Sequence, residues 1–141
     1  MRIEANGATM KMKKRLFLIA AAAALSVLAL SCASLPAPVP EGATAAEIIQ
    51  RAQDRSDIYD WKGAQFYYGV ILERFPNDLE LVASAKYELA FIEYKQGRYS
   101  EAAKGFEEVL AMYEGPLGAQ LSARWRILSE KLLAKIKAKG R

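Results

Sequence analysis

The sequence predicts an all-α fold, a short superhelix of two helical hairpins plus a C-terminal capping helix. From residue 44 onward, residue types recur 38 positions apart, and a repeat of about 20 to 50 residues signals stacked units. Residues that start and stop helices separate the apolar stretches, and no segment shows the alternation of a strand. The expected helices span about 44–57, 60–75, 79–96, 99–113 and 118–138.

Start and stop signals set these bounds. Thr44 and Glu47 have the spacing of a capping box, in which each residue satisfies a backbone N–H of the other. Pro76-Asn77-Asp78 ends the second helix and caps the third. Gly97 fits a left-handed stop after the third helix, and Gly115-Pro116 marks the last turn.

The 38-residue shift relates both halves of each hairpin. Among second helices, Asp60-Trp61-Lys62-Gly63-Ala64 aligns with Arg98-Tyr99-Ser100-Glu101-Ala102. Three sets align among the first helices and the last one: Ala46, Ile49 and Ala52; Ser84, Tyr87 and Ala90; Ser122, Trp125 and Leu128. A hairpin cannot bury its apolar stripe alone, so stacking is expected. The final helix is a capping helix because one stripe is apolar: Leu121, Trp125, Leu128, Leu132 and Ile136.

Residues Tyr87 to Ala102, with Phe106 one turn on, resemble a tetratricopeptide repeat. The family places small residues where paired helices cross, an aromatic residue at the turn and a proline after the second helix. The small residues here are Ala52, Ala64, Ala90 and Ala102, the turn aromatics are Trp61 and Tyr99, and the proline is Pro76. Arg51 and Arg55 depart from the pattern, and the family period is usually 34. The ending Arg74 to Asn77 is similar to that of BamD-like lipoproteins and Tol-Pal-associated repeat proteins of the bacterial envelope.

The resemblance implies that the first helix of each hairpin lines a partner-binding groove. The residues placed there are Ile49, Gln53, Tyr87, Phe91, Tyr94, Lys95, Ser122, Trp125 and Ser129. Core packing is the alternative for each of the aromatic residues. Family members that grip a C-terminal carboxylate use Lys and Asn, and only Lys95 matches here. An apolar or extended peptide is therefore the expected ligand.

Residues 1–31 have the pattern of a secretory signal peptide. Lys11, Lys13, Lys14 and Arg15 precede an apolar run from Leu16 to Leu30. As a helix this run spans about 22 Å, less than the ~30 Å hydrocarbon core, so cleavage is preferred over a retained anchor. The start codon could be Met1, Met10 or Met12.

Cys32, the sole cysteine, follows the apolar run directly. The segment from Ala29 to Cys32 resembles a lipobox, although Ala29 and Leu30 depart from its preferred residues. Lipidation of Cys32 is expected; ordinary cleavage after Ser31, leaving a free thiol, is the alternative. In the Gram-negative sorting pattern that the lipobox implies, Ala33 directs the lipoprotein to the periplasmic face of the outer membrane; the cell surface and the inner membrane are the alternatives. Residues 32–43 are rich in Pro and Ala and are expected to form an extended tether to a helical domain at 44–139.

Composition argues against several function classes. Residues 1–31 hold five of the 20 basic residues and one of the 16 acidic ones, so the remainder is neutral and nucleic-acid binding is not expected. The chain has no histidine, the usual general base and metal ligand. Glu88, Glu93, Glu107 and Glu108 are expected on solvated helix faces. No enzyme activity, cofactor, metal or small-molecule substrate is expected.

The sequence therefore predicts a periplasmic scaffold that binds proteins of an envelope complex, such as the outer-membrane assembly machinery. The alternative is a repeat lipoprotein that binds peptides or assists a solute transporter. Residues 116–141 carry seven basic residues against one acidic residue. This basic segment is either a solvated helix face or a contact with acidic lipid or an acidic partner.

Overall fold

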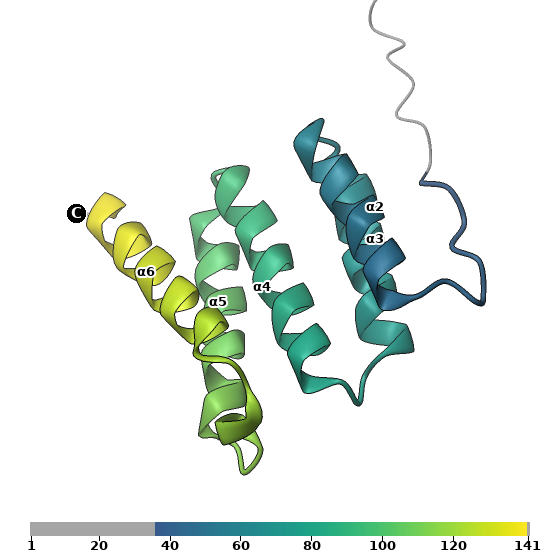
Figure 1. Ribbon diagram of the computed structural model, residues 1–141. Coiled ribbons are helices and arrows are strands. Elements are labelled where there is room, and N and C mark those ends of the chain that lie inside the picture. Colours follow the sequence, from purple (N-terminus) through teal and green to yellow (C-terminus); the bar gives the residue numbers. More distant parts are fainter. Residues whose placement is uncertain (1–35, 141) are drawn as a thin grey trace, which may run out of the picture. The chain divides into compact units, whose positions relative to one another are not determined.

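The structure, a computed structural model, describes residues 36–140. The predicted signal peptide and Cys32 lie outside these residues. Within them the chain forms five α-helices and a short 3₁₀ turn, and no strand, so the expected all-α fold is confirmed (Figure 1). The elements are α2 (Ala45–Asp57), α3 (Trp61–Arg74), α4 (Leu79–Lys95), α5 (Tyr99–Glu114), η1 (Gly118–Gln120) and α6 (Ala123–Lys139).

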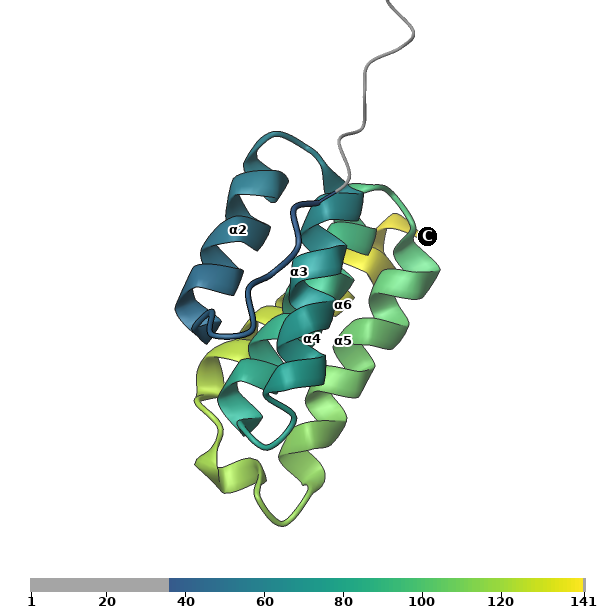
Figure 2. The same ribbon diagram turned by 90° about the vertical axis from the view of Figure 1, so that its right-hand side faces the viewer.

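The helices form two hairpins, α2–α3 and α4–α5, and α6 closes the second one. Each helix packs against its neighbour in sequence, and α6 also contacts α4. Helices α2, α4 and α6 lie in one layer, and α3 and α5 form the other (Figures 1 and 2). The first helix of each hairpin and the closing helix therefore share one face of the molecule.

Polar side chains cap three helices, and the caps at Thr44 and Asp78 are those that the sequence predicted. Thr44 donates its N–H to Glu47 at 2.7 Å, and the Glu47 N–H is 3.3 Å from the Thr44 hydroxyl oxygen, which completes the capping box. Asp60 accepts the Gly63 N–H at 3.0 Å, and Asp78 accepts the Leu81 N–H at 3.0 Å. These bonds fix the starts of α2, α3 and α4.

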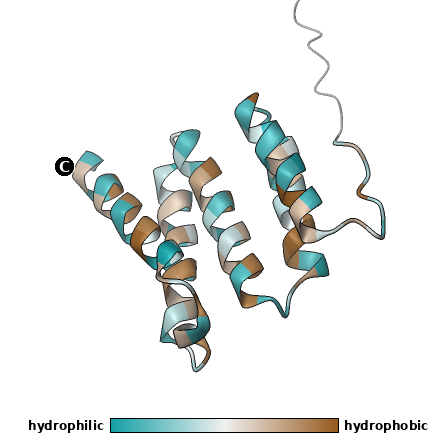
Figure 3. Ribbon diagram, in the orientation of Figure 1, coloured by the Kyte–Doolittle hydropathy of each residue, from teal (hydrophilic) through white to brown (hydrophobic). Residues whose placement is uncertain are grey.

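The two hairpins bury corresponding positions of the 38-residue repeat. Four pairs are buried in both: Ala52 and Ala90, Ala64 and Ala102, Tyr68 and Phe106, and Ile71 and Val109. The predicted stripe of α6 also packs on the second hairpin, and Figure 3 shows apolar and polar segments alternating along that helix. The alanines let paired helices approach closely, while the larger residues fill the space between layers.

The last helix begins later than predicted, at Ala123 and not at residue 118. Gly118 explains the difference, because a Cβ there would lie 2.2 Å from the carbonyl oxygen of Tyr113. The chain turns tightly through η1, and Leu121 is extended and buried. Ser122 then donates its N–H and hydroxyl to the Glu80 carboxylate at 3.2 and 3.0 Å. This polar contact ties the start of α6 to α4.

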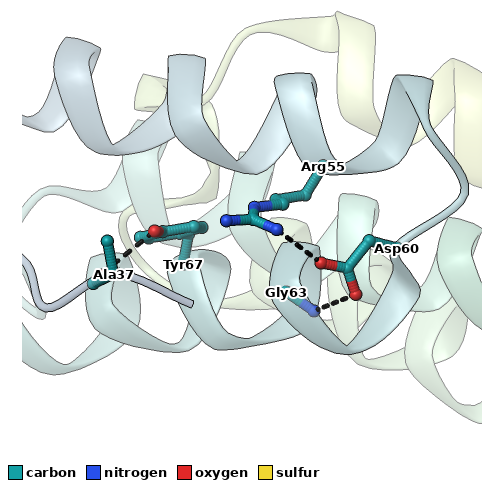
Figure 4. A network of polar contacts seen from close by, with 5 residues as sticks. All are labelled: Ala37, Arg55, Asp60, Gly63 and Tyr67. Atoms are coloured by element: carbon teal, nitrogen blue, oxygen red, sulfur yellow. Dashed lines mark hydrogen bonds and ion pairs between the residues drawn. The ribbon is translucent and has the colours of Figure 1, made fainter. Parts of the chain in front are cut away.

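The expected tether is part of the domain from Ala37 onward. The Tyr67 hydroxyl donates to the Ala37 carbonyl at 3.1 Å (Figure 4). The Arg74 guanidinium donates to the carbonyls of Val39 and Pro40 at 2.9 and 2.7 Å. Residues 36–40 are not helical, as expected of a proline-rich segment, yet they lie on the first hairpin instead of leading away from it. Because the prolines prevent a helix here, the backbone carbonyls of residues 37–40 have no helical N–H partner. They can therefore accept hydrogen bonds from Tyr67 and Arg74.

Among residues 36–140, no helix is both long enough and apolar enough to cross a bilayer.

Candidate partner-binding cleft

Three of the residues placed in the groove by resemblance are buried, so their placement in the groove is wrong: Tyr87, Trp125 and Ser129, which is 0% exposed. Tyr87 and Trp125 are each 7% exposed, and their rings lie 5.4 Å apart between α4 and α6. The Trp125 indole N–H donates to Glu80 at 2.6 Å. Ile49 is partly buried and packs on the core of the first hairpin. The side chains of Tyr87, Trp125 and Ile49 hold helices together, so the packing alternative describes them better than groove exposure.

Three other predicted residues line one cleft. Gln53 comes from α2, and Phe91 and Lys95 come from α4. Tyr94 instead packs between Phe91 and Tyr99, with ring centroids 6.3 and 5.6 Å away. The cleft has a volume of about 340 Å³ and is lined by Gln53, Ser56, Asp57, Tyr59, Trp61, Tyr68, Glu88, Phe91, Ile92 and Lys95. We call it the α2–α4 cleft.

The aromatic wall of the cleft comes from the turn between α2 and α3. Tyr59 is 71% exposed, and its ring meets the Trp61 ring edge-on at 5.5 Å. Tyr59 also has a positive φ of 61°, which is unfavourable for a residue with a bulky side chain. The equivalent position of the second hairpin, 38 residues later, is Gly97, which has a similar φ of 78°. Tyr59 is therefore an exposed aromatic residue held in an unfavourable backbone conformation.

Substituting Tyr59 by glycine is expected to raise the free energy of unfolding by about 0.5–1 kcal/mol, because glycine adopts positive φ without strain. Gly97→Ala is the matched opposite change and should lower it by about 1–2 kcal/mol, since nothing within 4 Å of the added Cβ compensates. Urea unfolding followed by circular dichroism measures both. Destabilisation by Tyr59→Gly would show that the tyrosine side chain is chiefly structural.

Arg55 makes an ion pair within the first hairpin. Its guanidinium donates to Asp60 at 3.0 Å, and the same carboxylate caps α3 through Gly63 (Figure 4). The arginine therefore joins α2 to the start of α3 beside the cleft.

Glu88 differs from the other carboxylates of the second hairpin. It is partly buried, as Glu93 also is, so the predicted position on a solvated face is wrong for both. Desolvation raises the pKa of the Glu88 carboxyl, while nearby Arg124 opposes the rise. Within residues 36–140 Glu88 makes no hydrogen bond or ion pair. By contrast, Glu93 accepts from Gln65 at 2.9 Å, and Glu108 pairs with Lys86 at 2.7 Å. Glu88 is thus a carboxylate directed at the cleft without a partner.

The tyrosines beside Glu88 titrate abnormally. Burial, with a smaller contribution from the Glu88 charge, raises the pKa of Tyr87 to about 12. The pKa of Tyr68 is raised by the same two causes and by Asp57. Burial of both side chains thus disfavours the charged phenolate form.

Residues of the basic segment have several environments. The Arg124 guanidinium lies 4.6 Å from the Trp125 ring centroid, and Arg126 lies 5.7 Å from that of Tyr113. Lys139 donates to the Tyr99 hydroxyl at 2.8 Å. Lys131 and Lys135 are exposed. Part of this segment therefore packs on aromatic rings and part forms a solvated helix face.

Among residues 36–140, no three acidic, cysteine or histidine side chains cluster as metal ligands would.

Sequence reasoning missed Tyr59, Trp61, Tyr68 and Glu88 as cleft residues. One signal could have found the first of them, because Tyr59 occupies the repeat position that Gly97 fills in the next hairpin. The positions of Tyr68 and Glu88 carried no such signal. They reach the cleft because α3 and α4 pack side by side, a contact that the period alone does not define.

Comparisons with known proteins identify a similar chain but no family. A Treponema pallidum protein described as uncharacterized is 37% identical over 109 residues. The match covers 76% of this chain and 44% of the relative, so this chain spans less than half the length of that protein. No protein-family model matches, and no solved structure matches.

Proposed function

We propose that this chain is a lipid-anchored repeat protein of the bacterial envelope that binds an extended segment of a partner protein. It acts as a scaffold and not as an enzyme. The observation that carries the proposal is the α2–α4 cleft, which joins an exposed aromatic wall to polar groups on the face shared by α2 and α4. Aromatic side chains with a few polar groups are typical of interface anchors.

A tetratricopeptide-like array is supported by correspondence between the hairpins. Asp60 and Arg98 are the N-cap residues of α3 and α5, and they stand 38 residues apart. The same interval relates the positive-φ residues Tyr59 and Gly97. Arrays of this kind present binding surfaces along one face of the stacked helices.

The anchor is proposed from the sequence. Lipidation at Cys32 would hold the protein at a membrane, since several acyl chains add about 0.8 kcal/mol for each buried methylene. We expect wild-type protein expressed in a Gram-negative cell to sediment with outer membranes and to incorporate labelled palmitate. Cys32→Ser should abolish the label and release most of the protein from the membrane fraction. An unlabelled wild-type protein would overturn the anchor while leaving the cleft proposal open to its own test.

Partner binding is tested by detergent extraction and affinity capture with three chains. Wild type and Phe66→Ala are expected to retain the same envelope protein, because Phe66 is 41% exposed and lies outside the cleft. Tyr59→Asn should lose it, and because asparagine tolerates positive φ the fold should remain intact. Equal capture by all three chains would place the partner elsewhere.

A further inference from the structure

The second hairpin shows how this chain accommodates a cation on its turn aromatics. The Lys139 ammonium lies 4.6 Å from the Tyr99 ring centroid and 5.3 Å from that of Tyr94. It also donates to the Tyr99 hydroxyl at 2.8 Å, and this bond raises the pKa of the lysine. Ammonium groups are attracted to aromatic faces by the ring quadrupole. The lysine at the end of α6 thus packs on Tyr94 and Tyr99, the aromatic residues on either side of the turn of the second hairpin.

The first hairpin has the same aromatic position but a hollow beside it. Trp61 corresponds to Tyr99 at the 38-residue shift, and it begins α3 as Tyr99 begins α5. Tyr59 adds a second ring at 5.5 Å, and Phe91 of α4 lines the same cleft. In the second hairpin Lys139 lies over the Tyr99 ring. In the cleft of the first hairpin the lysine Lys95 lies over Phe91, and the walls formed by Tyr59 and Trp61 border the hollow.

The charges of the cleft favour a positive occupant. Asp57 and Glu88 line it, against the single basic lining residue Lys95. Lys95 lies over Phe91 at 5.9 Å from the ring centroid and makes no ion pair with a described residue. Burial has already removed part of the hydration of Glu88, so a cation that binds it displaces less water and forms a charge-assisted hydrogen bond. Aromatic faces and a carboxylate together match ammonium and guanidinium groups.

We propose that the α2–α4 cleft holds a lysine or arginine side chain of the bound partner segment. Glu88 supplies the opposite charge, and Tyr59 and Trp61 supply the aromatic walls. The proposal rests on the proposed function and deepens it, because it assigns the partner's chemistry: an extended segment carrying a basic residue.

Capped seven-residue peptides that differ only at the central residue test this assignment. They carry Lys, Arg, Gln or Glu and are titrated into the purified full chain in nonionic detergent. The two tryptophan indole N–H signals are followed by ¹⁵N NMR and assigned with Trp61→Phe. We expect the Lys and Arg peptides to shift the Trp61 signal saturably, while the buried Trp125 signal stays in place. Equal shifts by the Gln peptide would overturn the proposal.

Glu88→Gln with Glu107→Gln as control separates charge recognition from folding. Glu88→Gln should weaken binding of the Lys peptide about tenfold. It is expected to fold, because removing a desolvated charge relieves a cost to the native state. Glu107 is exposed on α5 outside the cleft, so Glu107→Gln should bind as wild type does. Undiminished binding by folded Glu88→Gln would overturn the proposal. Partner capture that needs Tyr59 but shows no preference for Lys would refute this inference alone and leave the proposed function standing.

Discussion

Replacing Phe106 by alanine is expected to lower the free energy of unfolding by about 3–5 kcal/mol. The side chain is 0% exposed and is among the largest fully buried side chains of the described residues. Its ring lies 5.6 Å from that of Tyr87, which in turn contacts Trp125, so one cavity would loosen α4, α5 and α6 together. Urea unfolding followed by circular dichroism measures the change.

Phe66→Ala is the matched control, since it removes the same atoms from α3 at a site that is 41% exposed. It should cost less than about 1 kcal/mol. Similar losses for the two variants would contradict the packing of α5 against α4 and α6.

Gly105→Ala is expected to lower the free energy of unfolding by about 1–3 kcal/mol, although alanine is the better helix former. An added Cβ would lie 2.6 Å from the Cβ of Ala90 and 3.3 Å from its Cα. Both contacts are with groups fixed to the α4 backbone, so the helices must separate to relieve them. Thermal unfolding and urea midpoints should fall together.

Gly69→Ala is also a glycine-to-alanine change within a helix, but it is expected to raise the free energy of unfolding. Gly69 lies within α3, and nothing is found within 4 Å of its added Cβ. Only helix propensity then acts, which favours alanine by up to about 1 kcal/mol. Stabilisation at residue 69 with destabilisation at residue 105 is the predicted pattern. Stabilisation at both would mean that α4 and α5 do not cross at Ala90.

The sequence predicted the helices well because their bounds depend on local chemistry. Thr44, Asp60 and Asp78 cap backbone groups within three residues, and Gly97 supplies the positive φ that the turn requires. The predicted start of α6 was wrong, because the actual start depends on contacts with residues far away in the sequence. There the Glu80 carboxylate accepts a hydrogen bond from Ser122, and the backbone of Gly118 packs against the carbonyl of Tyr113.

The candidate site was only partly predictable. The resemblance placed Gln53, Phe91 and Lys95 in one groove, and in the structure these three residues line one cleft, because residues on corresponding faces of α2 and α4 meet there. It could not tell whether an aromatic residue in that layer is buried or exposed. Tyr87 is buried by α6, whereas Phe91, one turn further on, lines the cleft. Burial of this kind is set by the neighbouring helix, which a repeat pattern does not describe.

Site-specific photo-crosslinking in living cells tests the central claim, that the α2–α4 cleft binds a partner protein. A photoreactive amino acid replaces Gln53, an exposed residue that lines the cleft, or Glu107, an exposed residue of α5 outside it. The account predicts an adduct with one envelope protein from position 53 in the membrane fraction and none from position 107. An adduct from position 107 alone, or the same adduct from both positions, would contradict it.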